Sequence, residues 1–441
     1  MRGARVFTND LNRDCYPART RRRGIAIGTV ALLTVCLALV SPRTIPFCAP
    51  ALFVTTFAAL CVRGPASFRS FSPGAGALTA AAFLGYALLS SVWAERPLDT
   101  LPPVLGAAVY FAGCGLVMHT MLQEKRHNIF HISEGVWMGL FSGLVYLLIE
   151  ILSKQTIKLH LYNALGLSPG MLRPPSFFQW EGTRLVSIAP SDLTRNIAPV
   201  TLFLWSALLA LRGTSPAGFA RVTAVALFLV ATAVVFLSEH ETSKLALAGG
   251  AVAFALARIT PLWAERLLRV AWVTMCLAAI PISLTLHRLN LHNAPWIQET
   301  ARHRIVIWNH TAEESLKSPV IGIGAGMMYG IAASEPAPPA GEKFSWKVPH
   351  AHNVYLQTWF ELGMIGAALL TLVGLAILER IRRFGRRIAP YAQATFASSA
   401  IMAASSYGMW QVWFVAMYGL TAALFAIAIR ANIRAETVAR G

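Results

Sequence analysis

The chain has 441 residues, of which 56% are hydrophobic and only 13% are charged. About a quarter of the residues of an ordinary soluble protein are charged, so this composition excludes that class. The formal net charge of +18 is large enough for a nucleic-acid-binding protein, and the positions of the basic residues decide whether that class applies.

Apolar stretches recur from residue 25 almost to the C-terminus, and most have the length of about 17 to 25 residues that crosses a bilayer. Pro102-Pro103 and Gly249-Gly250 interrupt two of them, and one stretch is short. The sequence predicts an all-α integral membrane protein with about twelve transmembrane helices, at 25–41, 45–62, 75–93, 101–121, 135–152, 193–211, 218–238, 244–258, 268–286, 353–378, 389–407 and 410–429.

The basic residues gather in short loops between these helices. With twelve helices, every cluster falls on the side of the N-terminus, and the excess of Lys and Arg marks that side as cytoplasmic. Topology therefore explains the charge, and no nucleic-acid partner is needed. The clusters are Arg19–Arg23, Arg63/Arg69, Lys125-Arg126, Arg212/Arg221, Arg258/Arg266/Arg269, Arg380–Arg387 and Arg430/Arg434.

The helices divide the chain into five parts. A basic cytoplasmic N-terminus is predicted for 1–24, helices 1–9 for 25–286, and a long extracytoplasmic loop between helices 9 and 10 for 287–352. Helices 10–12 follow at 353–430, and a cytoplasmic C-terminus at 431–441. The N-terminal 45 residues lack a convincing small-x-small cleavage site, so we interpret them as a tail and a first span rather than a signal peptide.

The two long outer loops carry most of the polar chemistry. The first, about 153–192, contains Arg184. The second has a helical pattern at Ala301–Lys317, which Pro319 ends, followed by a glycine-rich segment (Ile321–Gly326) and an Ala/Pro/Glu stretch at 332–342. No Lys-Ser/Thr follows the glycines, so they do not form an ATP phosphate loop. Chemistry outside the cytoplasm without ATP requires a substrate that arrives already activated.

The cations at the outer ends of the spans favour an anionic substrate. Lys244 opens a span, where it either pairs with Glu239 or Glu241 or faces a lipid-linked phosphate. Arg302 and Arg304 begin the helical segment, where they either face lipid headgroups or bind phosphate through the guanidinium fork.

His352 stands at the mouth of an apolar helix, where packing does not require an imidazole. The ordinary histidine pKa near 6.5 suits His352 as a general base. The alternative is that His352 helps to cap the helix, although the neighbouring Asn353 is the more typical cap residue. His350, two residues earlier, either tunes His352 or binds substrate. His-x-His is not a helical ligand pair, and we predict no metal site from these residues with Glu239 and His240.

The order of these residues along the chain is that of a known family signature. His352-Asn353, nine residues and Gly363-Met-Ile-Gly366 resemble the signature His-[Asn/Ser/Gln]-x9-Gly-x-x-[Gly/Thr/Tyr] of the O-antigen ligase/polymerase superfamily. Arg304-x-x-x-Trp308 and the proline- and glycine-rich run precede it, as in the large periplasmic loop of that family. Ser243-Lys244 stands where the family commonly has Ser-Arg, a departure that keeps the charge and loses the fork.

The resemblance implies a multi-pass glycosyltransferase of the bacterial inner membrane, with both termini cytoplasmic, that takes a glycan from undecaprenyl diphosphate at the periplasmic face. The predicted function is O-antigen ligase, with the lipid A–core oligosaccharide as acceptor, His352 as general base, and no metal, ATP or other cofactor. The residues assigned to substrate binding are Arg304, Lys244, Arg302, Arg184, His350 and Asn353.

Other functions stay open at this point. A polymerase of O-antigen or exopolysaccharide shares the donor and differs in the acceptor, and a third branch of the family transfers glycans to protein hydroxyls. A lipid-linked-glycan flippase is disfavoured because translocation favours ionisable residues inside the helices, where this sequence has few. A purely structural membrane scaffold does not account for the ordered motifs.

Overall fold

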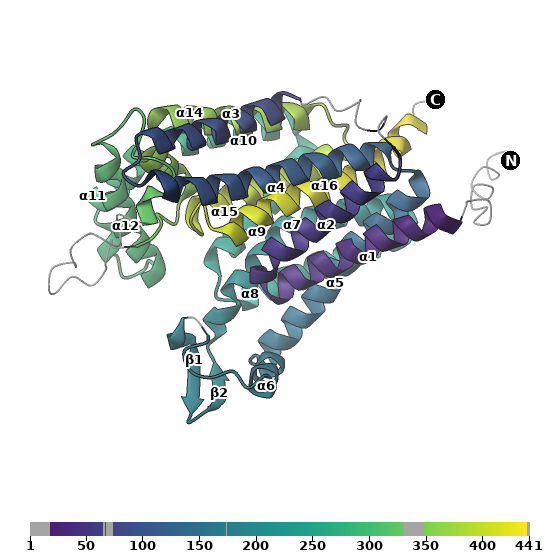
Figure 1. Ribbon diagram of the computed structural model, residues 1–441, viewed down its shortest axis with the longest axis horizontal. Helices are drawn as coiled ribbons and strands as arrows, with labels where there is room; N and C mark the ends of the chain where they lie inside the picture. Colours follow the sequence, from purple (N-terminus) through teal and green to yellow (C-terminus); the bar gives the residue numbers. More distant parts are fainter. Residues whose placement is uncertain (1–17, 65–66, 68–73, 173, 330–347, 439–441) are drawn as a thin grey trace.

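The computed structural model describes residues 18–64, 67, 74–172, 174–329 and 348–438, and it shows an all-α multi-pass membrane protein with one small hairpin (Figure 1). The predicted stretch at 332–342 lies outside these residues. The helices are α1 Ala18–Val40, α2 Ile45–Cys61, α3 Ala75–Leu89, α4 Pro97–Gln123, α5 Arg126–Leu152, α6 Thr156–Ala164, α7 Thr194–Thr214, α8 Ala217–Leu237, α9 Glu241–Ile259, α10 Pro261–Leu277, α11 Ala279–Arg288, α12 Glu299–Ser315, α14 Val354–Arg382, α15 Ala389–Ser405 and α16 Val412–Val438; the strands are β1 Phe178–Glu181 and β2 Arg184–Ile188.

A helix lies at each of the twelve predicted positions, but not all of them qualify as spans by themselves. Among the described residues, ten helices are long and apolar enough to cross a membrane, and α10 with α11 makes an eleventh if this pair, bent by 73°, is one span. The remaining helix, α15, has 17 residues and is shorter than all ten. Hydropathy located the helices, whereas their bends and ends depend on packing.

The centre of the bundle is α7, which is apolar on every side and is buried almost throughout. A helix that is hydrophobic all round belongs in an interior, and α7 packs against α5, α8, α15 and α16. Trp205 on α7 donates a hydrogen bond from Nε1 to the Ser398 hydroxyl at 3.0 Å and stacks on Phe254 of α9. These contacts fix α9 and α15, each of which has one end at the site described below.

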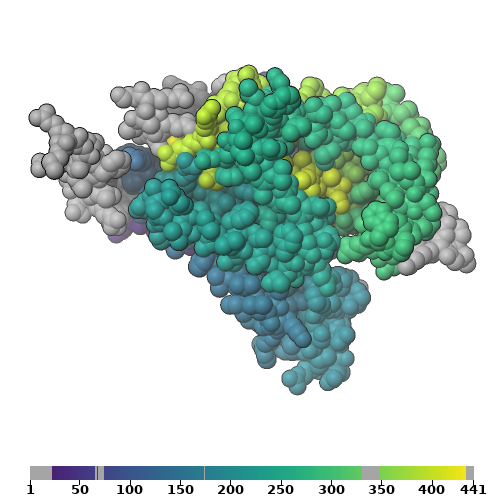
Figure 2. All heavy atoms as spheres, turned by 180° about the vertical axis from the view of Figure 1, so that it is seen from behind, coloured from purple at the N-terminus to yellow at the C-terminus, as the bar shows by residue number. Residues whose placement is uncertain are grey.

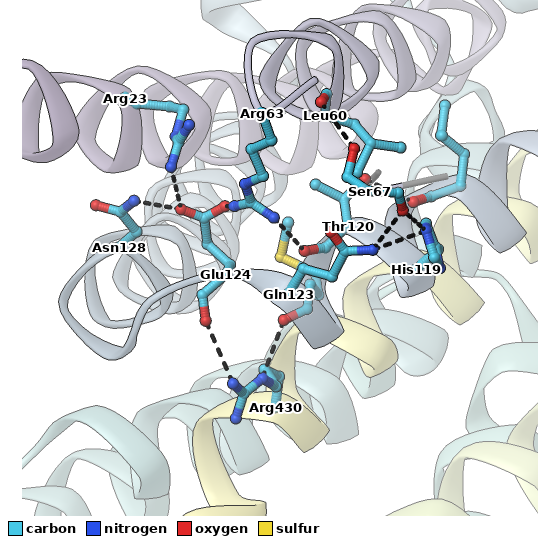
Figure 3. A network of polar contacts seen from close by, with 12 residues as sticks. Arg23, Leu60, Arg63, Ser67, His119, Thr120, Gln123, Glu124, Asn128 and Arg430 are labelled. Atoms are coloured by element: carbon cyan, nitrogen blue, oxygen red, sulfur yellow. Dashed lines mark hydrogen bonds and ion pairs between the residues drawn. The ribbon is translucent and has the colours of Figure 1, made fainter. Parts of the chain in front are cut away.

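A buried carboxylate, Glu124, joins four helices at one end of the bundle (Figure 3). It pairs with Arg23 of α1 at 3.2 Å and with Arg63 beyond α2, and accepts a hydrogen bond from Asn128 of α5. Arg430 of α16 donates to the Glu124 backbone carbonyl at 3.3 Å. Thus α1 begins at the end of the bundle where α16 ends.

A small appendage projects from the bundle where the sequence predicted only a loop (Figures 1 and 2). It consists of α6 and an antiparallel hairpin of β1 and β2, in which Glu181 is opposite Arg184. Two contacts at its base hold it: Gln155 donates to the Ala189 carbonyl at 2.8 Å, and Lys158 pairs with Asp192 at 2.6 Å. The hairpin was not predicted because its few strand residues give no long periodic signal.

A break in α14 receives the glycine-rich segment. Gly363 has φ 61° and ψ −162°, a conformation that is nearly restricted to glycine. Two N–H groups at the break donate to the segment that follows α12: Met364 to Pro319 at 2.9 Å and Ile365 to Val320 at 3.2 Å. The two backbones meet so closely that a Cβ on Gly363 would lie 2.4 Å from the Val320 carbonyl. Gly363 is therefore a contact point between two backbone segments.

Gly363→Ala is expected to lower the free energy of unfolding by about 3 kcal/mol, because it adds backbone strain to a steric overlap. Thermal unfolding in detergent by intrinsic fluorescence measures this loss. Gly115→Ala in α4 is the matched control, since a Cβ at Gly115 meets nothing within 4 Å. Equal midpoints for the two variants would contradict the role assigned to Gly363.

Candidate functional site

The predicted site residues other than Arg184 lie at the end of the bundle opposite Glu124. They are contributed by the N-terminus of α9, by α12 and by the segment 348–353 ahead of α14, and the turn 406–411 between α15 and α16 (the 406–411 turn) packs against them. Because α16 begins at this turn and ends beside Glu124, the length of one whole span separates the two ends. The helix α12, predicted as Ala301–Lys317, lies at the same end (Figure 1).

The structure fixes both the tautomer and the protonation of His352. Its Nδ1 lies 2.6 Å from the backbone carbonyl of Ser406. A carbonyl only accepts, so Nδ1 carries a hydrogen, and in the neutral imidazole Nε2 then has the free lone pair. Burial lowers the pKa of His352 to about 4; the Ser406 carbonyl opposes this shift and the charge of Arg304 adds to it. His352 is therefore a neutral imidazole near pH 7, the form that a general base requires.

His350 packs beside His352, with ring centroids 4.2 Å apart. Gly408 of the 406–411 turn leaves the room for it, because a Cβ there would lie 2.7 Å from the His350 Cβ. Burial, with smaller contributions from His352 and Arg195, lowers the pKa of His350 to about 3. Both imidazoles are neutral at ambient pH.

The motif Arg304-x-x-x-Trp308 places two side chains on one face of α12, because residues four apart on a helix are neighbours. Trp308 donates from Nε1 to the Ala351 carbonyl at 2.9 Å, between the two histidines. Arg304 donates to the Ser405 hydroxyl at 3.0 Å and lies 3.4 Å from the Thr242 hydroxyl. Burial lowers the pKa of Arg304 from its usual 12.5, yet a guanidinium keeps its charge at neutral pH.

Three residues that the sequence did not assign to the site also belong to this neighbourhood. His240 at the start of α9 is buried, its Nδ1 lies 2.6 Å from the Ser243 hydroxyl, and its ring stacks on Tyr407. Burial lowers the pKa of His240 to about 3 and raises that of Tyr407 to about 12. The charge of Arg195 acts on both Tyr407 and His350. His240 and Arg195 were visible as polar residues at span mouths, whereas nothing in the sequence singled out Tyr407.

The remaining predicted residues have other partners or lie on other parts of the fold. Lys244 pairs with Glu241 at 2.8 Å, the local ion pair considered from the sequence. The Asn353 side chain accepts from the Leu356 N–H at 3.1 Å and so caps α14. Arg302 precedes Arg304 by two positions, a spacing that turns side chains to different helix faces. Arg184 lies on β2 in the projecting appendage, apart from α12 (Figure 1).

The assembled groups suit one kind of chemistry. Arg304 and Arg195 are cations, His352 is an imidazole whose Nε2 does not bond the Ser406 carbonyl, and the Ser405 and Thr242 hydroxyls orient Arg304. A fixed cation and a neutral imidazole at the outer end of a bundle can bind a phosphate and remove a proton from a hydroxyl.

Comparison with known proteins relates part of this chain to ligases. Residues 225–371 match the family model described as O-antigen ligase. Proteins named "Putative polysaccharide ligase" from Rickettsia conorii and Rickettsia prowazekii are each 27% identical, over 52% and 51% of this chain and 56% and 55% of their own length; one from Rickettsia felis is 28% identical over 51% and 55%.

The chain thus spans about half the length of these relatives. The region that matches the family model contains Lys244, Arg304, His352 and Gly363, and it covers the ordered motifs that the resemblance rested on. The likeness to the O-antigen ligase family thus covers residues 225–371, about a third of the chain.

Proposed function

We propose that this protein is a polysaccharide ligase of the bacterial inner membrane, which transfers a glycan from undecaprenyl diphosphate to a lipid A–core acceptor at the periplasmic face. One observation carries the proposal: the Ser406 carbonyl holds Nδ1 of His352 at 2.6 Å, and the half-buried Arg304 donates to the hydroxyl of the adjacent Ser405 at 3.0 Å. The names of the Rickettsia relatives support a ligase acting on polysaccharide.

The proposed mechanism is a direct displacement at the anomeric carbon. Nε2 of His352 takes the proton of the acceptor hydroxyl, and the oxygen bonds to the anomeric carbon as its bond to the phosphate oxygen breaks. The diphosphate leaves with the electron pair, and its charge is stabilised by Arg304, helped by Arg302, Lys244 and, on the hairpin, Arg184. His350 and Asn353 contribute to substrate binding. The reaction inverts the anomeric centre and needs neither metal nor ATP, because the diphosphate bond supplies the energy.

We infer the orientation of the protein from the positions of its basic residues. The end that holds Arg23, Arg63 and Arg430 is proposed to face the cytoplasm, with both termini, and the end that holds His352 the periplasm. This places the site on the side where no ATP is present and a preactivated lipid-linked donor is required.

The test is an electrophoretic profile of lipopolysaccharide from a deletion strain, complemented with wild type or with His352→Ala. We expect loss of glycan-bearing bands, polymer accumulating on undecaprenyl diphosphate, rescue by wild type and no rescue by the variant. A band with a single repeat would identify a polymerase instead. An unchanged profile would overturn the lipid A–core acceptor and direct attention to exopolysaccharide or protein acceptors, or to translocation of the lipid-linked glycan.

A further inference from the structure

A second buried carboxylate lies nine residues beyond His352 and has no part in the proposed mechanism. Glu361 is 0% exposed and sits within the apolar helix α14. Its Oε2 accepts from the Gly326 N–H at 2.9 Å and from Trp410 Nε1 at 2.5 Å, and its Oε1 accepts from Gln357 Nε2 at 2.9 Å. Burying a carboxylate is expensive unless it is fully hydrogen-bonded, and here every one of these partners is a donor.

Two of these partners come from segments outside α14, whereas Gln357 lies on α14 itself. Gly326 ends the glycine-rich segment after α12, and Trp410 belongs to the 406–411 turn. The same helix also exposes backbone carbonyls at its break, where Gly324 donates to the Glu361 carbonyl at 2.8 Å. Glu361 thus fastens the glycine-rich segment and the 406–411 turn to one point of α14.

A second hydrogen-bonded path, through Gln357, connects Glu361 to the 406–411 turn. Gln357 donates through Nε2 to Glu361, and its Oε1 accepts from the Met409 N–H at 3.2 Å. The orientation of the Gln357 amide is therefore set by having an acceptor on one side and a donor on the other. The turn that is held in this way carries the Ser406 carbonyl bonded to His352 and the Gly408 that packs on His350.

We propose that Glu361 is a positioning residue of the transfer reaction. It holds the 406–411 turn where the Ser406 carbonyl aims Nε2 of His352 at the acceptor hydroxyl. This role rests on the proposed function. A displacement of about 1 Å at a reacting group can cost roughly 100-fold in rate, so a residue remote from the substrate can have a large effect.

The pattern of donors and acceptors predicts a rescue. In Glu361→Gln the new amide NH₂ is a donor, and it must face either the Gly326 and Trp410 donors or the NH₂ of Gln357. If the Gln357 amide flips to accept from it, the Met409 N–H loses its acceptor. Gln357→Glu places a second carboxylate against the first. The swap Gln357→Glu with Glu361→Gln restores every pair. The amide introduced at position 361 would accept from Gly326 and Trp410 and donate to the carboxylate introduced at position 357, and that carboxylate would accept from Met409.

The experiment compares wild type, both single variants and the swap in two measurements. The first is transfer by purified protein; we expect kcat to fall about 100-fold in Glu361→Gln with little change in the KM of the donor, and to recover in the swap. The second is the distance distribution between spin labels at Tyr329→Cys and Val412→Cys, in a background without native cysteines. Both sites are exposed and lie next to the two fastened segments. The distribution should broaden in Glu361→Gln and narrow again in the swap.

The outcomes separate the two proposals. Wild-type kcat in Glu361→Gln, or a swap that narrows the distance distribution without restoring kcat, would overturn the role of Glu361 and leave the proposed function standing. Normal transfer by His352→Ala would overturn the proposed function, whatever the spin labels report. Loss of transfer in Glu361→Gln and recovery of both readouts in the swap would support the positioning role, because a packing defect would not be repaired by moving the carboxylate four residues.

Discussion

Replacing His352 with alanine is expected to abolish glycan transfer while the protein still inserts and folds. The imidazole is the group proposed to take the proton of the acceptor hydroxyl, and general-base catalysis typically contributes about 10²–10⁴-fold to a rate. Release of undecaprenyl diphosphate by purified protein measures the loss. His287→Ala is a matched control, since this imidazole stacks on His292 at the end of α11 rather than on the pair at 350 and 352. Transfer at the wild-type rate by His352→Ala would exclude it as the base.

The pH dependence follows from the same residue. The pKa of His352 is lowered to about 4, so the neutral base predominates above that value and is protonated below it. Transfer by wild type is expected to be insensitive to pH from about 8 to 5, as far as this residue is concerned, and to fall as the pH is lowered through 4. A fall that begins near pH 6.5, the ordinary value for histidine, would contradict the buried environment of His352.

Replacing Arg304 with alanine is expected to reduce use of the donor by about 100-fold, because a preorganised cation at the leaving group is lost. Arg304→Lys should restore only part of the rate, since lysine keeps the charge and loses the two-pronged geometry that matches a phosphate. Initial rates over a range of donor concentrations measure both effects. Full activity of the lysine variant would argue against bidentate contact with the diphosphate.

The control for this pair must exclude a structural explanation. Arg304 also bridges α12 to Ser405 and Thr242, so the thermal midpoint of each variant has to be measured beside its rate. Arg288→Ala removes an exposed arginine at the end of α11 and should leave both quantities near wild type. An equal loss of rate in Arg288→Ala would indicate a general effect of surface charge.

The sequence by itself determined the class of the protein and the order of its motifs. Hydropathy is a local property, so twelve apolar stretches predicted helices where helices are found. The periodic pattern of Ala301–Lys317 likewise predicted the helix α12, because helical periodicity relates residues three and four apart. His352 was recognisable because an imidazole at the mouth of an apolar helix has no packing reason to be there.

Only the tertiary structure decided which distant segments of the chain contact one another. The bend of 73° between α10 and α11, the break at Gly363 and the contacts of Glu361 with Gly326 and Trp410 depend on chain segments far apart in sequence. Tyr407 and His240 meet for the same reason. Local periodicity shows which residues share a helix face. Burial, hydrogen-bond partners and pKa shifts arise from neighbours brought together by folding, and these determine that His352 is neutral and which of its nitrogens carries the proton.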